Sequence, residues 1–172
     1  KSNIDIPIGK WIKCDKCKEI IYKETLKENY DICPNCGHYF RMHIGRRLKQ
    51  IIDEGTYKRF DLKIDTVNPL ELEDYPKKLK KLREKTKLEE AIGCGIGEIN
   101  GEKVVIGIMD SGFLMGSMGA VVGEKITYSI EKAIELHLPF IMFSTSGGAR
   151  MQEGIISLMQ MAKTTEALTK LN

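Results

Sequence analysis

Hydrophobic positions along the chain recur with two spacings, one typical of helices and one of strands. Between residues 44 and 55 the apolar residues follow helical spacing, with Arg and Lys on the other face, which predicts a short amphipathic helix. A second candidate helix opens at Tyr75-Pro76, after an irregular stretch from Asp61 to Asp74. A longer helix is expected from about Gly123 to Pro139. Its apolar side is formed by residues at helical spacing: Val122, Ile126, Ile130, Ala133 and His137.

Three apolar runs have the composition of strands. Residues 95–99 and 103–109 flank Asn100-Gly101, and Asn-Gly predicts a hairpin because both turn positions need positive φ. Residues 140–143 are continuously apolar, as in a strand buried on both faces. The final helix, expected to begin in the loop at 146–149, is apolar almost all round and is therefore predicted to lie buried between layers. The order strand, strand, helix, strand, helix predicts a layered α/β fold.

Four of the five cysteines have the spacing of a zinc ribbon. Cys14 and Cys17 form one C-x2-C pair, and Cys33 and Cys36 form a second one after a 15-residue gap. Two such turns supply the four thiolates that a tetrahedral Zn²⁺ prefers, and this closed shell predicts a structural zinc ion. A small hairpin is expected between the pairs. The alternatives are two disulfides, a redox dithiol, or His38 as a substitute ligand.

Composition excludes several classes of protein. The 172 residues are 42% hydrophobic and 30% charged, which excludes collagenous, low-complexity and disulfide-miniprotein chains. No apolar run approaches the roughly 20 residues that span a bilayer. The start, Lys-Ser-Asn-Ile-Asp, lacks the apolar stretch of a signal peptide. We therefore expect a cytoplasmic protein with no membrane contact.

Charge divides the chain after Lys87. The first part carries 21 basic and 14 acidic residues (+7), and the second carries 6 and 10 (−4). We expect three domains: a zinc ribbon (11–38), a helical basic connector (39–87) and an α/β domain (88–172). The lysines between 77 and 87 indicate either a solvated helix that crosses between modules or a phosphate-binding face. Four aromatic residues of the first part either pack a small core or contact nucleic acid: Trp11, Tyr30, Tyr39 and Phe40.

Two glycine-rich loops, 116–119 and 146–149, each precede a predicted helix. Unpaired N–H groups at a helix N-terminus attract anions, so the two loops could clasp one developing oxyanion if they face the same cleft. Neither loop has the ending of a P-loop, and residues 93–97 lie before a hairpin and so fail the dinucleotide fingerprint. A serine hydrolase would need His137 beside Ser144 or Ser146, and His137 is better explained as a packed residue. Cys94 is expected to be a small buried residue.

The motifs resemble those of one family. The four-cysteine ribbon, the segment from Gly116 to Lys125 (GSMGAVVGEK) and the segments 146–154 (SGGARMQEG) and 157–163 (SLMQMAK) are similar to the carboxyltransferase beta subunits of bacterial acetyl-CoA carboxylase. Met115 stands where the family usually has another glycine. The resemblance implies a partial crotonase-like fold of β-β-α units. It also implies transfer of a carboxyl group from carboxybiotin on a carrier protein to acetyl-CoA, which forms malonyl-CoA for fatty acid synthesis.

The same resemblance implies site residues and partners. The amides of Gly147 and Gly148, with Gly119, would hold the enolate oxygen of the thioester, and biotin itself would take the proton. Arg150 would bind the thioester or the phosphates of CoA, or else pair with Glu153. The alpha subunit, the biotin carboxyl carrier protein and biotin carboxylase, which consumes the ATP, are the implied partners. Because family members continue past Asn172, we expect a truncated chain that is inactive alone.

The competing hypothesis is a nucleic-acid-binding module. A zinc ribbon with a basic charge often binds nucleic acid, and the α/β domain would then be a passenger. The paired glycine loops favour the enzyme, since nucleic-acid binding does not require them.

Overall fold

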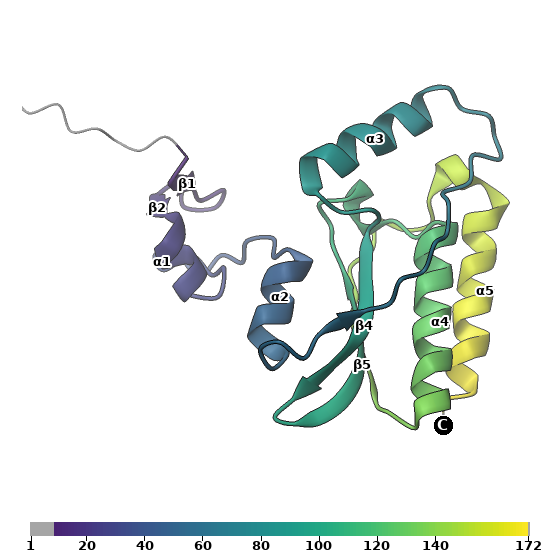
Figure 1. Ribbon diagram of the computed structural model, residues 1–172. Coiled ribbons are helices and arrows are strands. Elements are labelled where there is room, and N and C mark those ends of the chain that lie inside the picture. Colours follow the sequence, from purple (N-terminus) through teal and green to yellow (C-terminus); the bar gives the residue numbers. More distant parts are fainter. Residues whose placement is uncertain (1–8, 172) are drawn as a thin grey trace, which may run out of the picture. The chain divides into compact units, whose positions relative to one another are not determined.

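The computed structural model describes residues 9–171, which form two compact units, 9–42 and 43–171 (Figure 1). The segment where we expect no signal peptide, residues 1–8, and the last residue, Asn172, lie outside the described part. No helix between residues 9 and 171 is both long and apolar enough to cross a lipid bilayer. The connector expected over 39–87 is divided, because the boundary between the units follows Met42.

The smaller unit is built around two tight turns, each of which contains a Cys-x-x-Cys pair. β1 (Trp11–Lys13) and β2 (Ile20–Tyr22) pair antiparallel across the first turn. An antiparallel bridge joins Ile32 to Tyr39 across the second. α1 (Lys23–Glu28) lies between the two turns in the sequence. The hairpin expected between the cysteine pairs is therefore wrong, since the strands flank a pair and a helix follows them.

The core of the smaller unit is very small. Four residues are buried in it: Cys14, Ile21, Leu26 and Cys33. Of the four aromatic residues expected to pack this core, only Phe40 does so. Trp11, Tyr30 and Tyr39 are 47%, 66% and 75% exposed. With so little apolar area removed from water, this unit needs another source of stability.

The larger unit contains a four-stranded sheet in the order β3-β4-β5-β6. β4 (Ile92–Ile99) and β5 (Glu102–Met109) form the predicted hairpin, and Asn100-Gly101 at its turn has φ values of 52° and 83°. Tight hairpin turns require these positive values. β3 (Lys58–Arg59) pairs antiparallel with β4, and β6 (Phe140–Phe143) pairs parallel with β5.

Helices cover both faces of this sheet (Figure 1). α3 (Asp74–Thr86) and α4 (Ala120–Leu136) contribute to the core on one face, and α2 (Ile44–Ile51) packs against the other. α4 also connects β5 to β6, and α5 (Ile155–Thr169) runs beside it. The structure therefore confirms the predicted order of strands and helices.

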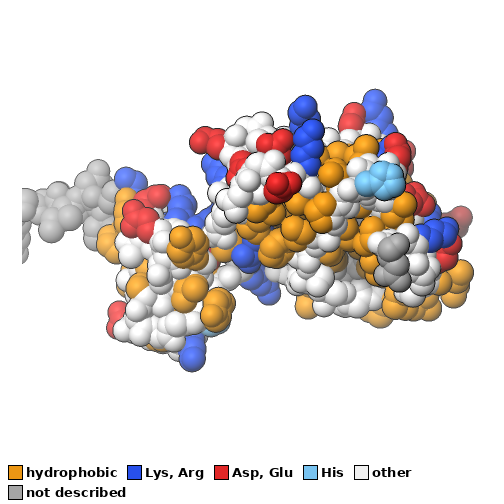
Figure 2. All heavy atoms as spheres, turned by 90° about the horizontal axis from the view of Figure 1, so that it is seen from below, with side chains coloured by type: hydrophobic (Ala, Val, Ile, Leu, Met, Phe, Trp, Pro, Cys, Tyr) orange, Lys and Arg blue, Asp and Glu red, His pale blue; other side chains and the backbone are white. Residues whose placement is uncertain are grey.

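Two segments are more exposed than their apolar sequences predict. All four residues of β6, an edge strand of the sheet, are only partly buried. The buried residues of α5 are small or polar: Ser157, Gln160 and Ala167. Large apolar residues of α5 face solvent instead, including Ile155 at 68% and Met159 at 57% exposure. Figure 2 shows that hydrophobic side chains are exposed on one face of the larger unit. The expected burial of both segments is wrong for residues 9–171.

α3 belongs entirely to the larger unit. Tyr75 and Leu79 are buried in its core, while the lysines of the helix are exposed. The solvated basic face is confirmed, but the crossing between modules is wrong. The phosphate-binding alternative stays a prediction.

Gly123 on α4 lies where α4 and α5 pack together. A Cβ there would come 2.6 Å from Cβ of Gln160 on α5, so the two backbones would have to separate. We expect Gly123→Ala to lower the free energy of unfolding by about 1–3 kcal/mol. This expected change is the net result, after the roughly 1 kcal/mol by which alanine favours a helix over glycine.

Gly45→Ala is the matched control for this prediction. Gly45 lies in α2, and no atom lies within 4 Å of the position that an added methyl group would take, so only the helix propensity changes. Urea denaturation of both variants measures the difference. If Gly123→Ala is as stable as Gly45→Ala, the close packing of α4 on α5 is wrong.

Candidate functional site

The four cysteines of the smaller unit converge on one point. Sγ of Cys14 lies 3.8 Å from Sγ of Cys36, and Sγ of Cys17 lies 3.7 Å from Sγ of Cys33. All four sulfurs lie within 4.8 Å of one another, and none forms a disulfide. Tetrahedral zinc with Zn–S bonds of about 2.3 Å separates its sulfurs by about 3.8 Å. The donor set therefore fits a structural Zn²⁺, as expected.

His38 is not part of this metal centre. Its ring packs against Phe40, with the ring centroids 5.5 Å apart, and the metal-binding group contains only the four cysteines. Both the disulfide alternative and the substitute-ligand alternative are wrong.

The thiols also have the electrostatics of a cation site. A hydrogen bond from the Glu19 backbone lowers the pKa of Cys17 to about 6, which favours the thiolate form that a metal ion binds. Burial and the neighbouring sulfurs raise the pKa of Cys36 to about 12. Four sulfurs this close cannot all ionise without a cation between them, and a bound metal ion supplies that charge.

The two glycine-rich loops of the larger unit come together, as the enzyme hypothesis requires. Met118 and Ala149 form a parallel bridge. The Met118 N–H donates to the Gly148 carbonyl at 3.0 Å, and the Arg150 N–H donates to the Met118 carbonyl at 2.9 Å. Segments about 30 residues apart in sequence thus form one backbone structure.

Gly147 and Gly148 are exposed on this joined loop. The Gly148 N–H donates to Oγ of Ser146 at 3.0 Å, whereas the Gly147 N–H has no acceptor among residues 9–171. Gly148 has φ of +89°, which favours glycine. A Cβ on Gly147 would lie 3.1 Å from Cβ of Met115, so the first loop packs tightly against the second. Gly147 is therefore an exposed residue whose N–H has no acceptor among residues 9–171.

The predicted start of the final helix is wrong. A short 3₁₀ turn, Met151–Glu153, and Gly154 follow the loop, and α5 begins only at Ile155. Gly147 and Gly148 therefore present amides from a loop and not from the N-terminus of a helix, so any anion they bind is held by individual N–H groups.

Gly119 directly precedes α4, as predicted, but the end of this helix is already occupied. The Ala120 N–H donates to Oε2 of Glu153 at 2.6 Å, and a Cβ on Gly119 would lie 2.5 Å from Oε1 of the same carboxylate. Gly119 and Glu153 are both buried. An internal carboxylate therefore caps α4, which gives no support to Gly119 as a donor to substrate.

Arg150 is committed to an internal network. It is 1% exposed, and its guanidinium binds both carboxylate oxygens of Glu90, at 2.7 and 2.8 Å. It also donates to Oε1 of Glu153 at 3.1 Å and to the Ser117 carbonyl at 2.9 Å. The ion-pair interpretation of Arg150 is confirmed. The expectation that it binds CoA is not supported, since its donors are turned away from solvent.

Two members of this network were not anticipated from sequence. Glu90 is 2% exposed, and the Tyr75 hydroxyl donates to Oε1 of Glu153 at 2.6 Å. Burial and the neighbouring Glu153 carboxylate raise the pKa of Tyr75, which keeps it a donor. The available signal was the position of Glu90, directly before the buried run that starts at Ala91.

The remaining candidates from the sequence are not catalytic in this geometry. His137 ends α4 in a left-handed conformation and is exposed, so the prediction of a packed histidine is wrong. Between residues 9 and 171 no histidine is hydrogen-bonded to Ser144 or Ser146. Cys94 is buried, as expected, and burial raises its pKa to about 11, so it is a poor nucleophile.

Comparison with known protein families identifies the domain family that contains the joined loops. Residues 57–172, two thirds of the chain, match the model of the carboxyl transferase domain. The chain belongs to the carboxyl transferase domain family. Residues 11–36 match the acetyl-CoA carboxylase zinc finger domain. The ribbon is thus a part of this carboxyl transferase family member, and the view of it as a separate regulatory module is wrong.

Relatives of this family member carry both parts. It is 56% identical over 167 residues to a Clostridium botulinum (strain Kyoto) protein named acetyl-coenzyme A carboxylase carboxyl transferase subunit beta, covering 97% of the chain and 58% of that protein. It is 61% identical over 166 residues to a Natranaerobius thermophilus protein named for subunits beta/alpha, covering 96% and 27%. The chain therefore spans little more than half the length of the first and about a quarter of the second.

Solved structures confirm the crotonase-like fold. The transcarboxylase 12S structure with hydrolysed methylmalonyl-coenzyme A bound is similar with a TM-score of 0.64 and 26% identity, over 76% of this chain and 24% of that one. A Pseudomonas malonate decarboxylase MdcD-MdcE heterodimer is similar with a TM-score of 0.56 and 20% identity, over 76% and 47%.

Proposed function

We propose that this chain is part of the beta subunit of an acetyl-CoA carboxylase carboxyltransferase, which forms malonyl-CoA from acetyl-CoA for fatty acid synthesis. Membership of the carboxyl transferase family, the matching zinc finger domain and the names of the relatives support this assignment. The observation that carries it is the exposed loop at Gly147-Gly148, in which the Gly147 N–H has no acceptor among residues 9–171.

In the proposed reaction this loop would stabilise the negative charge that develops on the thioester oxygen. Carboxybiotin on a carrier protein supplies the carboxyl group, and acetyl-CoA must accept it at the carbon next to its thioester. Charge then develops on the thioester oxygen, and preorganised N–H donors stabilise it. We assign this task to the Gly147 amide, and the Gly148 amide can join it when the exposed Ser146 side chain rotates away.

The partners follow from the same proposal. The alpha subunit would complete the transferase, and the biotin carboxyl carrier protein would bring carboxybiotin from biotin carboxylase, where ATP is consumed. The cytoplasm is the proposed location, because the CoA esters of the proposed reaction are soluble. Nucleic acid stays a predicted additional ligand of the ribbon, whose exposed aromatic residues Trp11, Tyr30 and Tyr39 stand among lysines. Salt-dependent retention on DNA or RNA tests that ligand.

Gly147→Pro tests the enzyme, because proline removes the N–H. We expect kcat to fall about 10²–10³-fold, the cost of losing one oxyanion donor. The assay is malonyl-CoA-dependent carboxylation of a biotin derivative by the full-length protein with its alpha subunit.

Gly147→Ala is the matched variant. It keeps the N–H and adds only the Cβ that crowds Met115. It should retain most of the kcat that Gly147→Pro loses. Equal losses in both variants would assign the effect to loop packing and remove Gly147 as a donor, while no turnover by the unaltered complex would remove the proposed function.

A further inference from the structure

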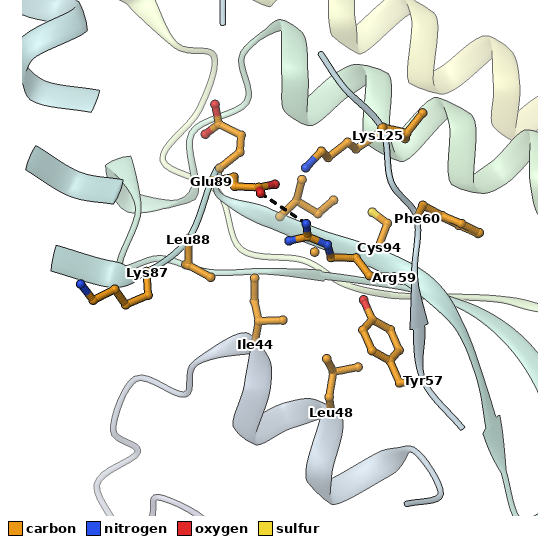
Figure 3. Close-up of a pocket in the computed structure, with 14 residues that line it drawn as sticks. Ile44, Leu48, Tyr57, Arg59, Phe60, Lys87, Leu88, Glu89, Cys94 and Lys125 are labelled. Atoms are coloured by element: carbon orange, nitrogen blue, oxygen red, sulfur yellow. Dashed lines mark hydrogen bonds and ion pairs between the residues drawn. The ribbon is translucent and has the colours of Figure 1, made fainter. Parts of the chain in front are cut away.

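A small hollow in the larger unit lies apart from the glycine loops (Figure 3). Its volume is about 140 Å³. It lies where β3 ends: the Phe60 N–H still donates to the Cys94 carbonyl, but β3 pairs with β4 only at Gly95 and Ile96. Beside Gly93 this edge of β4 therefore has no partner strand among residues 9–171, and the side chain of Ile44 packs there, 3.2 Å from the position that a Cβ on Gly93 would take.

The walls of the hollow are mostly apolar. They come from α2, the β3 segment and the start of β4, and include Ile44, Leu48, Tyr57, Phe60, Leu88 and Ile92. Burial raises the pKa of the Tyr57 hydroxyl to about 12, so Tyr57 remains neutral at physiological pH. A ligand for this space needs an apolar body.

Lys125 of α4 reaches into this hollow and is 8% exposed (Figure 3). Its ammonium lies close enough to Cys94 to favour the ionised thiol. Yet among residues 9–171 no carboxylate lies within 4.0 Å of Nζ, and no acceptor binds it. A buried charge without a partner costs free energy, so an anion bound beside Lys125 would stabilise the protein.

The nearby acids do not pair with Lys125 directly, because each of them lies more than 4.0 Å from its Nζ and is bound to an arginine instead. Glu89 pairs with Arg59 at 3.3 Å at the rim of the hollow. Glu90 binds Arg150 through both oxygens, at 2.7 and 2.8 Å. Among the described residues that line the hollow, Lys125 is therefore a buried cation without a direct ion-pair partner, whereas the other lysine of the lining, Lys87, is exposed.

We propose that this hollow binds a small monocarboxylate with a short apolar tail, held by Lys125 as its counter-ion. The volume equals that of about five water molecules, which suits a ligand of roughly five to seven heavy atoms. So few atoms limit the affinity, and we expect dissociation constants in the millimolar range. This site is independent of the proposed carboxyltransferase activity, and it uses neither of the glycine loops.

Three probe molecules separate the parts of this proposal. Butyrate has the charge and the tail, butyramide has only the tail, and inorganic phosphate has only the charge. In ligand-observed NMR with the full chain, butyrate should bind at least tenfold more tightly than the other two. Butyramide binding as tightly as butyrate would refute the role of the charge, and phosphate binding as tightly would refute the apolar site.

Variants of Lys125 locate the site. Lys125→Met should weaken butyrate binding at least tenfold, and Lys125→Arg should restore much of it. Lys80→Met, on the exposed face of α3, should leave binding unchanged. Unaltered butyrate binding by Lys125→Met would overturn the proposal.

A thermal measurement guards against misfolding of the variants. Lys125→Met removes an unpaired buried charge. Its midpoint temperature of thermal unfolding without ligand should therefore equal or exceed that of the unaltered chain. Butyrate should raise the midpoint of the unaltered chain and leave that of Lys125→Met in place. A lower midpoint for Lys125→Met without ligand would show that Lys125 already has a structural partner and would also overturn the proposal.

Discussion

Removal of zinc is expected to unfold residues 11–36 while the larger unit stays folded. The smaller unit buries only four residues in its core, and two of them are cysteines of the metal centre. Structural zinc contributes roughly 10–16 kcal/mol of apparent binding free energy in small domains, which here would be almost all of the folding energy. The hydrophobic core clusters of the larger unit include no residue before Ile44.

The measurement is a chelator titration followed by amide NMR, with released zinc quantified by a colorimetric indicator. Signals of the smaller unit should collapse to random-coil positions, and those of the larger unit should persist. Cys14→Ser should have the same effect without chelator. Cys94→Ser, a buried cysteine outside the metal centre, should retain one zinc per chain. Loss of zinc from Cys94→Ser, or a folded ribbon in its absence, would contradict the structural role.

Replacement of Arg150 by methionine is expected to destabilise the larger unit by about 3–5 kcal/mol, because Glu90 and Glu153 then lie buried without a cation. Arg59→Met is the matched control. Arg59 also pairs with a glutamate, at 3.3 Å, but both side chains are more than half exposed. Exposed pairs contribute about 0–1 kcal/mol, so this control should change little. Urea denaturation measures both.

A loss of stability in Arg150→Met no larger than that in Arg59→Met would show that the ion pairs of Arg150 with Glu90 and Glu153 do not stabilise the larger unit.

The sequence predicted best those features that depend on neighbouring residues. The cysteine spacing identifies a metal centre because each pair forms its own turn, and Asn100-Gly101 identifies a hairpin because its two residues tolerate positive φ. Helices α2 and α4 follow from the helical spacing of their apolar residues, and the Tyr75-Pro76 pair marks the start of α3. The resemblance of whole motifs, rather than any single residue, identified the family.

Two local predictions failed, the hairpin between the cysteine pairs and the start of the final helix, and the other failures concern partners distant in sequence. Nothing near Arg150 in the sequence indicates that both terminal nitrogens of its guanidinium bind the carboxylate of Glu90, 60 residues earlier. Nor does the loop before α4 reveal that Glu153 caps this helix from 33 residues away. The unpaired ammonium of Lys125 is equally invisible in the sequence, since it depends on the end of β3. The apolar composition of a helix indicates that it is suited to burial, but not which part of a polypeptide covers it. Helix α5 is an example, because its large apolar side chains are exposed within residues 9–171.

The two edges of the sheet have opposite characters. β3 ends one edge with two exposed basic residues, Lys58 and Arg59, and charge of this kind discourages further pairing. Strand β6 has no charged residue that would discourage pairing at the other edge. In the order of elements, α5 follows β6 in the same way that α4 follows β5. The repeat is therefore extensible in one direction only. An additional parallel strand could join beside β6 with α5 as its crossover, which would enclose the apolar side chains of that helix without rearranging what is already folded.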